Sequence, residues 1–481
     1  MGAVTEVRVS ALALEELRSV IAPDAWERLV GGLDQARSLL DGRSLWNVNS
    51  TAAGGGVAEM LWSWVGLAQG LGISMRWLTI SGHAEFFTLT KRLHNFLHGE
   101  PGDGGELGEA ERRVYEEVTA ANAAALLETV GADDVIFLHD PQTAGLVAPL
   151  VESGRTVVWR CHIGSDEQNE VSAAGWAFLE PYIRRADACV FSRRAYVPDC
   201  LEGMLVAIVP PSIDALSAKN QELAAEQVGA ILRQAGLAPG DGGEVEGAEF
   251  RRRGGGVERI VRRCELISSG ALPDEAVPLV VQVSRWDRLK DPVGVIEGFA
   301  AAAAEGSSAH LILAGPSLGS VSDDPDGAMV LAEVELAWRQ LPEQVRDRVH
   351  LACLPMEDLE ENAAIVNALQ RRASIIVQKS LKEGFGLTVT EAMWKARPVL
   401  ASATGGIRDQ IEDRVSGILL ANPLSRAEFA GALAELLDDV EWATRIGAAA
   451  RERVRASFLE DRHSLQYVEL LGQLLGARAP S

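Results

Sequence analysis

Short apolar stretches alternate with helical ones along most of this chain, and the series starts twice. Apolar runs of four to eight residues, bounded by Gly, Pro or polar residues, are typical of buried strands. Strands that alternate with helices favour a parallel sheet covered on both faces, so the sequence predicts two doubly wound α/β domains. Strands are expected at 45–49, 75–80, 135–138, 156–160, 188–191 and 206–209, and again at 279–283, 310–314, 349–354, 374–378, 398–401 and 417–420.

The two series divide the chain into segments. At about 150 residues per domain, 481 residues allow three domains or two long ones. We expect an N-terminal domain over 1–235, opening with a helix at 11–41, and a C-terminal domain over 276–455. Between them, 236–275 is interpreted as a Gly- and Arg-rich insertion or linker. The last segment, 456–481, is expected to be a helix that packs back towards the N-terminal domain.

Charge and cysteine content exclude several classes of protein. The 68 acidic and 45 basic residues give a net charge of −23, which argues against a general nucleic-acid binder because such proteins need a basic surface. A local pocket of Arg and Lys can still bind a small anion, although the run Arg251–Arg253 is expected to be a solvated loop. The five cysteines form no C-x-x-C pair, so we expect no zinc site, no disulfide framework and a cytoplasmic setting. The absence of an 18-residue apolar run argues against a membrane span.

Ligands of open α/β sheets bind beyond the carboxyl ends of the strands. If the two domains face each other, the loops at these ends line one cleft. The first such loop contains Gly54–Gly56, which could let a backbone approach a phosphate at a helix start or could be a plain flexible turn. No G-x-x-x-x-G-K-[ST] sequence is present, so a P-loop kinase or ATPase is not supported. The candidate loops are 50–56, 139–142, 161–166, 284–290, 315–317, 379–387 and 404–408.

Two basic residues follow the first strand of the second series. Arg285 and Lys290 stand five positions apart in a loop that enters a helix. Two fixed cations there could hold a diphosphate and stabilise negative charge on a leaving group. The alternative is surface charge, with Asp287 and Asp291 as partners.

Two glutamates frame the most specific feature of the second half. Glu383 and Glu391 stand eight positions apart, with a Gly-Phe-Gly loop and a helix start between them. Backbone N–H groups at that helix start would face an anion, and a carboxylate on the helix can bind two vicinal ribose hydroxyls. The alternative is a helix-capping acid with an exposed glutamate.

Histidines and a carboxylate follow two strands of the first half. His139 and Asp140 end one predicted strand, and His162 ends the next. Polar groups at strand ends suit sugar hydroxyls, although a single His is as often a structural residue.

These segments resemble known families of sugar-transferring enzymes. The second half is similar to the retaining nucleotide-sugar glycosyltransferases of the GT-B fold, on Ser284–Lys290, Ala314–Pro316, Glu383–Glu391 and Gly405–Ile407. The first half looks like the trehalose glycosyltransferring synthases and their trehalose phosphorylase relatives, on 47–50, 54–61, 86–91 with 94–95, 139–142, 159–163, and 210–214 with 219–220. The resemblance covers about residues 45–475. It implies an α/β GT-B architecture, in which two Rossmann-like doubly wound domains face an interdomain cleft.

The resemblance also implies roles for the matching residues. The implied catalytic residues are Glu383, Arg285, Lys290, His162 and Asp140. The implied donor site consists of Gly55, Gly56, Arg285, Lys290, Glu383, Phe385, Gly386, Leu387 and Glu391. The implied acceptor site consists of Lys91, His94, Asn95, Asp140 and Gln142. No metal ligand is implied.

On this resemblance, the chain is expected to be a retaining hexosyltransferase that moves α-glucose from ADP- or UDP-glucose to glucose, reversibly, to give trehalose. Front-face attack is expected, in which the departing phosphate helps to take the acceptor proton. No cofactor is expected to be tightly bound, and a divalent cation such as Mg²⁺ is a candidate stimulant. The alternatives are a trehalose phosphorylase, a transferase with a cyclitol or aminosugar acceptor, and a silent sugar-nucleotide sensor.

Three features depart from the family pattern. Gly164 stands where many relatives carry Asp directly after His-Ile, and 236–275 is longer than in compact members. The first 40 residues precede the resemblance. They are interpreted as a packed helical addition and a candidate contact in a homodimer.

Overall fold

The computed structural model describes residues 4–12, 14–52, 55–240, 243–304, 306–318 and 325–476. The chain divides into two compact units: unit 1 is residues 1–212 with 458–481, and unit 2 is residues 213–457. The division falls after Ser212 and not after residue 235, because α8 (Ala225–Ala235) packs against α12 (Leu359–Arg372) of unit 2.

Unit 1 is built on a seven-stranded sheet with the order β1-β3-β2-β4-β5-β6-β7. β1 is antiparallel to β3, and all the other neighbours are parallel. Every residue of β2, β4, β5 and β6 is buried, as their continuous apolar pattern predicts. The strands are β1 (Thr5–Glu6), β2 (Leu45–Asn49), β3 (Met75–Thr79), β4 (Val135–His139), β5 (Thr156–Cys161), β6 (Ala188–Phe191) and β7 (Val206–Ile208).

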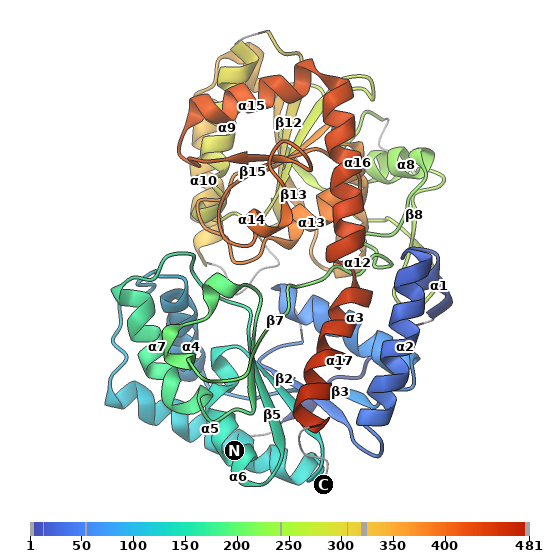
Figure 1. The fold of residues 1–481 in the computed structure, drawn as a ribbon. Coiled ribbons are helices and arrows are strands. Elements are labelled where there is room, and N and C mark those ends of the chain that lie inside the picture. The colour runs from blue at the N-terminus through green and yellow to red at the C-terminus, as the bar shows by residue number, and fades with distance from the viewer. Residues whose placement is uncertain are drawn as a thin grey trace. The chain divides into compact units, whose positions relative to one another are not determined.

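Helices cover both faces of this sheet (Figure 1). One face carries α2 (Pro23–Leu39), α3 (Gly55–Gly70) and α17 (Glu460–Gly476), and α17 packs along α2. The other face carries α4 (Ala84–Leu97), α5 (Glu109–Thr129), α6 (Val147–Glu152) and α7 (Glu170–Ile183). In the described ranges, no helix combines the length and apolar character that a membrane crossing requires.

Unit 2 has the same architecture. Its seven-stranded sheet has the order β10-β13-β12-β11-β14-β15-β16. Only the β10–β13 pair of this sheet is antiparallel. The predicted α/β class with two parallel sheets is therefore confirmed. The strands are β10 (Glu265–Ile267), β11 (Leu279–Val283), β12 (His310–Pro316), β13 (Val349–Leu354), β14 (Ile375–Gln378), β15 (Val399–Ser402) and β16 (Ile418–Leu420).

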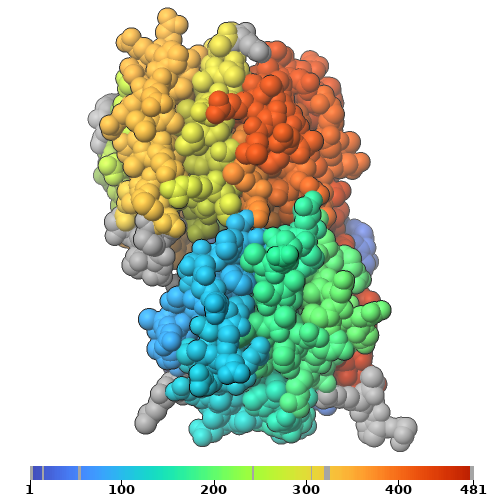
Figure 2. All heavy atoms as spheres, turned by 90° about the vertical axis from the view of Figure 1, so that its left-hand side faces the viewer, coloured from blue at the N-terminus to red at the C-terminus, as the bar shows by residue number. Residues whose placement is uncertain are grey.

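Two helical layers enclose the second sheet. Figure 2 shows the first layer from outside, with α10 (Pro325–Arg339), α9 (Pro292–Ala304) and α15 (Arg426–Asp438) side by side in gold, yellow and orange-red. The second layer contains α8, α12, α13 (Leu387–Trp394) and α16 (Val440–Ser457). The short helices α11 (Glu343–Arg346) and α14 (Ile407–Gln410) complete the unit.

The expectation of one helix over 11–41 is wrong. The structure has α1 (Leu14–Arg18) and α2, which begins at Pro23. Proline has no N–H to donate and is accommodated only in the first turn of a helix, so Pro23 starts a new helix instead of continuing the first.

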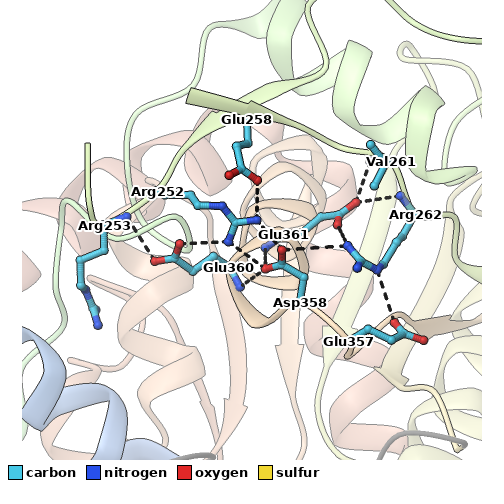
Figure 3. A network of polar contacts seen from close by, with 9 residues as sticks. All are labelled: Arg252, Arg253, Glu258, Val261, Arg262, Glu357, Asp358, Glu360 and Glu361. Atoms are coloured by element: carbon cyan, nitrogen blue, oxygen red, sulfur yellow. Dashed lines mark hydrogen bonds and ion pairs between the residues drawn. The ribbon is translucent and has the colours of Figure 1, made fainter. Parts of the chain in front are cut away.

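The expectation of a solvated arginine loop is wrong for Arg252. The Gly- and Arg-rich segment forms an antiparallel hairpin of β8 (Glu249–Arg251) and β9 (Val257–Arg259). Figure 3 shows Arg252 directed at carboxylates near the start of α12, where it contacts Asp358 and lies 3.2 Å from Glu360. Asp358 also accepts hydrogen bonds from the first backbone N–H groups of α12. Arg252 lowers the pKa of Asp358 to about 2, so Asp358 stays ionised and ion pairs attach the hairpin to the start of α12.

Candidate functional site

In each sheet the chain adds strands first on one side of a central strand and then on its other side. β2 lies between β3 and β4, and β11 lies between β12 and β14. In unit 1 the chain leaves β2 towards β3 and leaves β4 towards β5, on the opposite side, so the loops at the carboxyl ends of these two neighbouring strands diverge. In unit 2 the same holds for β11, which is followed by β12, and β14, which is followed by β15. Such switch points are where open α/β sheets bind ligands.

The switch point of unit 2 carries an ion pair. Lys290 ends the 3₁₀ turn Arg288–Lys290 after β11, and Glu383 lies in the loop after β14. Lys290 Nζ donates to Glu383 Oε2 at 2.6 Å, and Ser380 Oγ donates to the same oxygen at 3.1 Å. The turn is shaped by Asp287, whose carboxylate accepts from the backbone N–H of Leu289 at 2.9 Å. The structure therefore joins two of the residues that the sequence analysis placed in one site.

The loop after Glu383 is held tightly to the next loop. Gly386 has φ 84° and caps the start of α13, while Gly405 has φ 51°. A Cβ on Gly405 would lie 1.8 Å from the carbonyl oxygen of Glu383, so only glycine fits. Gly406 N–H donates to the Gly384 carbonyl at 2.8 Å, and buried Gln410 donates to the Phe385 carbonyl. These contacts place Phe385, Gly386 and Leu387 at the N-terminus of α13, where backbone N–H groups favour an anion.

Glu391 lies within α13, as the sequence predicts, and is 4% exposed. Its Oε1 is 3.6 Å from Lys219 Nζ. Lys395, one turn further along, donates from Nζ to the Glu391 carbonyl and to Asn220 Oδ1, both at 3.0 Å. Burial lowers the pKa of Lys395 to about 7, against the opposing effect of Glu391. The segment that carries Lys219 and Asn220 thus becomes part of the Glu391 environment.

Arg285 lies in the more open part of this region. Its side chain is 61% exposed and reaches Asp287 at 3.0 Å. This is the contact expected for ordinary surface charge, and the role of Arg285 in holding a diphosphate stays a prediction.

A buried polar cluster lies at the strand ends of unit 1. His139 Nδ1 is 3.0 Å from His162 Nε2, and His139 Nε2 is 3.0 Å from Asn47 Oδ1. Asp140 accepts from the backbone N–H of His162 at 2.8 Å. Arg160 Nε lies 3.1 Å from His162 Nε2. Strands β2, β4 and β5 thus bring together His139, Asp140 and His162.

Burial sets the charge states of this cluster. It lowers the pKa of His139 to about 3 and that of His162 well below its ordinary value, with the Arg160 charge acting in the same direction. Burial also raises the pKa of Asp140 to about 7, against the hydrogen bond from His162. Asp140 has φ 64°, an uncommon conformation for a residue other than glycine. Backbone strain of this kind occurs often at functional sites.

Other predicted residues lie on neighbouring elements. Lys91, His94 and Asn95 lie on α4, with Lys91 exposed. Gln142 lies in the 3₁₀ turn Pro141–Leu146, against which α4 packs. Gly55 is the first residue of α3 and Gly56 is exposed, whereas Gly54 is outside the described residues. The binding roles of these residues stay predictions.

Arg160, Tyr467 and Lys219 join these clusters although no role was expected for them from the sequence. Arg160 had a local signal, because an arginine within an apolar strand has to be paired when it is buried. It donates to the hydroxyl of Tyr467 on α17 and to the Val209 carbonyl at 3.1 Å. Tyr467 had no such signal, because an aromatic residue in a terminal helix is usually part of the core.

The fold and the family comparisons define a class of enzyme. The chain superposes on an α,α-trehalose-phosphate synthase (UDP-forming) from Burkholderia vietnamiensis with a TM-score of 0.66 and 16% identity, over 91% of this chain and 99% of that one. Residues 266–453 match the family described as glycosyl transferases group 1. The protein is a glycosyltransferase of the GT-B fold, built from two Rossmann-like domains.

Sequence relatives narrow the class to a family. A trehalose synthase from Rubrobacter xylanophilus is 35% identical over 96% of this chain and 97% of its own length. A trehalose synthase from Pyrococcus horikoshii is 33% identical over the same shares. Residues 47–198 match the family described as the trehalose synthase N-terminal domain. The chain belongs to the trehalose synthase family.

Proposed function

We propose that this enzyme transfers α-glucose from a nucleoside diphosphate glucose, with ADP or UDP as the nucleotide, to the anomeric hydroxyl of glucose. The products are trehalose and a nucleoside diphosphate, and the reaction is reversible with retention of configuration. The observation that carries the proposal is the Lys290–Glu383 pair at the switch point of unit 2, beside the N-terminus of α13.

Each group has a role that follows from its chemistry. Lys290 and Arg285 neutralise the diphosphate, and the charge on Lys290 stabilises the negative charge that grows as the glycosidic bond breaks. Backbone N–H groups at Phe385, Gly386 and Leu387 bind the phosphate oxygens. Glu391 accepts hydrogen bonds from the ribose hydroxyls.

Glu383 positions the transferred glucose by accepting hydrogen bonds from the hydroxyls of the sugar. Its pairing with Lys290 keeps the carboxylate oriented towards the loop before the donor arrives. No protein nucleophile is required, because the departing phosphate takes the proton of the attacking acceptor hydroxyl.

The acceptor side is assigned to unit 1. Neutral His162 can donate or accept a hydrogen bond without bringing a charge, which suits a sugar hydroxyl. Asp140, Lys91, His94, Asn95 and Gln142 are proposed to complete the acceptor site.

The free cysteines support a reducing compartment. Cys161, Cys189, Cys200, Cys264 and Cys353 are all unpaired thiols, and three of them are buried. Such usage fits the cytoplasm, where we propose that the enzyme works.

A trehalose phosphorylase is the second candidate function. A trehalose phosphorylase from Pleurotus sajor-caju is 26% identical over 84% of this chain and 54% of its own length. In that reaction phosphate takes the place of the nucleotide, and Glu391 would have no ribose to bind.

A product assay by mass spectrometry tests the proposal. The purified chain is incubated with glucose and, in separate reactions, ADP-glucose, UDP-glucose, GDP-glucose or glucose 1-phosphate. A nonreducing disaccharide with a released nucleoside diphosphate supports the proposal and identifies the donor. Product from glucose 1-phosphate alone supports the phosphorylase. No product from any donor overturns both, and would turn attention to cyclitol or aminosugar acceptors or to a silent sugar-nucleotide sensor.

A further inference from the structure

A cavity of unit 2 lies at the edge of its sheet opposite the switch point. It has a volume of about 690 Å³ and is lined by α8, by residues 273–275, by the first residue of β11, and by residues 371–374 at the end of α12 and before β14. Leu279 is the first residue of β11 and Val283 the last, so four steps of about 3.3 Å separate this edge from the carboxyl end by roughly 13 Å. A volume of this size suits a small organic molecule. The cavity is thus distinct from the switch point.

Basic side chains surround this cavity in a chain that is strongly acidic overall. Four arginines line it, namely Arg233, Arg371, Arg372 and Arg397, against two acidic residues, Asp274 and Glu275. The arginines are half-buried, whereas both acids are exposed. The lining therefore has a positive balance although the chain carries a net charge of −23.

Two of these arginines, Arg372 and Arg397, donate to backbone carbonyls, which orient the side chains without neutralising them. Arg372 donates to the carbonyls of Asp274 at 2.7 Å and Val277 at 2.9 Å. Arg397 donates to the carbonyls of Lys395 and Ala373 at 3.2 and 3.1 Å. Neutral carbonyls hold a guanidinium in place but leave its charge.

Only one of the four arginines that line the cavity pairs with a carboxylate among the described residues. In the described part of the chain, Arg371 pairs with Glu222 at 2.8 Å, but Arg233, Arg372 and Arg397 form no ion pair. Burial lowers the pKa of Arg397, and so do the nearby charges of Arg371 and Arg372. Burial also lowers the pKa of Arg371 and Arg372, against the charges of Glu222 and Glu275, so the acids offset the positive charge in part and a bound anion would offset more of it.

The remaining wall is apolar and is formed by Leu223, Val228, Leu232 and Leu237. An apolar wall beside several guanidinium groups suits a molecule with an organic body and a multivalent anionic group. A phosphate offers three oxygens and close to two charges, and guanidinium groups bind it through paired hydrogen bonds. We propose that this cavity binds a small phosphorylated organic molecule at a site separate from the donor site.

Calorimetric titration of the full chain tests the proposal. The probes are glucose 6-phosphate and AMP, and their unphosphorylated parents glucose and adenosine are titrated in parallel. At least one phosphorylated probe is expected to bind with one site per chain. Arg233→Gln and Arg397→Gln should each weaken that binding about tenfold, the loss of one charged hydrogen bond.

Two control variants separate this site from others. Arg339→Gln removes an exposed arginine paired with Glu335 and should leave binding unchanged. Lys290→Gln removes a charge at the switch point and should also leave it unchanged. Arg233 forms no hydrogen bond with its side chain in the described residues, so its variant is expected to fold normally, as circular dichroism would verify. The proposal is overturned if neither phosphorylated probe binds, or if their binding survives both arginine changes.

Discussion

Lys290 Nζ lies 2.6 Å from Glu383 Oε2, and this pair joins the loops after the neighbouring strands β11 and β14. The two side chains are only 16% and 11% exposed, so water screens their charges weakly. Breaking a buried pair by removing one partner leaves a charge that is costly to bury. The pair therefore preorganises the switch point before any substrate binds.

Removing the lysine should impair transfer more than binding. Lys290→Ala is expected to lower kcat by about 10²- to 10³-fold, or roughly 2.7–4 kcal/mol, because its charge acts mainly in the transition state. Glu383→Ala should abolish transfer while the fold is retained. Steady-state kinetics with the donor identified in the product assay measure both effects, with Arg339→Gln as the control. Near-normal turnover of either variant would contradict its assigned role.

Replacing the glycine beside Glu383 should destabilise the protein. A Cβ at Gly405 would overlap the Glu383 carbonyl oxygen, so Gly405→Ala is expected to cost about 2 kcal/mol or more of unfolding free energy. Gly431 provides the matched control, because it lies in α15 and its added Cβ would meet nothing within 4 Å. Gly431→Ala should stabilise unit 2 by about 0.5–1 kcal/mol. Equal denaturation midpoints for both variants would show that the two loops can separate without cost.

The C-terminal helix should depend on one phenolic hydroxyl. Tyr467→Phe leaves a donor of fully buried Arg160 without its acceptor, at an expected cost of about 1–3 kcal/mol. Tyr182→Phe is the control: its hydroxyl donates to Glu116 at 2.8 Å and accepts from Arg112 at 3.0 Å, but these groups are partly exposed and water can replace the bonds, so about 0.5 kcal/mol or less is expected. Urea denaturation measures both. A loss for Tyr467→Phe no greater than the control would show that Arg160 is satisfied elsewhere.

Acid should destabilise unit 1 through its buried histidines. The pKa of His139 is lowered to about 3, and those of His162 and His463 are also lowered well below 6.5. The unfolded chain therefore takes up these protons first, and stability falls as the pH drops from about 6.5 towards 3. Asp140 opposes this fall, because its raised pKa makes the folded chain take up a proton first as the pH drops through 7. Three histidines outweigh one carboxyl, so Tm should be lower at pH 5 than at pH 7.5.

One substitution isolates part of this acid dependence. Neither ring nitrogen of His463 has a hydrogen-bond partner among the described residues, and the ring packs on Trp64 and Tyr467 at centroid distances of 5.5 and 4.9 Å. His463→Phe should keep this packing, leave Tm at pH 7.5 equal or higher, and reduce the loss of Tm at pH 5. An unchanged difference in Tm between the two pH values would mean that His463 does not take part.

The charged hairpin shows where sequence patterns fail. The composition of the Gly- and Arg-rich segment predicts a solvated arginine loop. In the structure, however, Arg252 contacts Asp358, which lies 106 positions further along the chain. Its partners gather only because the hairpin lies against the start of α12. By contrast, the glycines around Glu383 had a local signal, since sharp turns before a helix require them.

The sequence by itself determined the α/β class, nearly all the parallel strands and the local placement of Glu383, Glu391 and His162, because periodicity and turn residues act over a few positions. Only the tertiary structure decided which of these residues meet. Lys290 and Glu383 are 93 positions apart, and Arg160 and Tyr467 are 307 apart. Such contacts follow from the order of strands in each sheet and from the return of α17 to unit 1. That order results from packing the whole apolar surface at once, which no local stretch of sequence specifies.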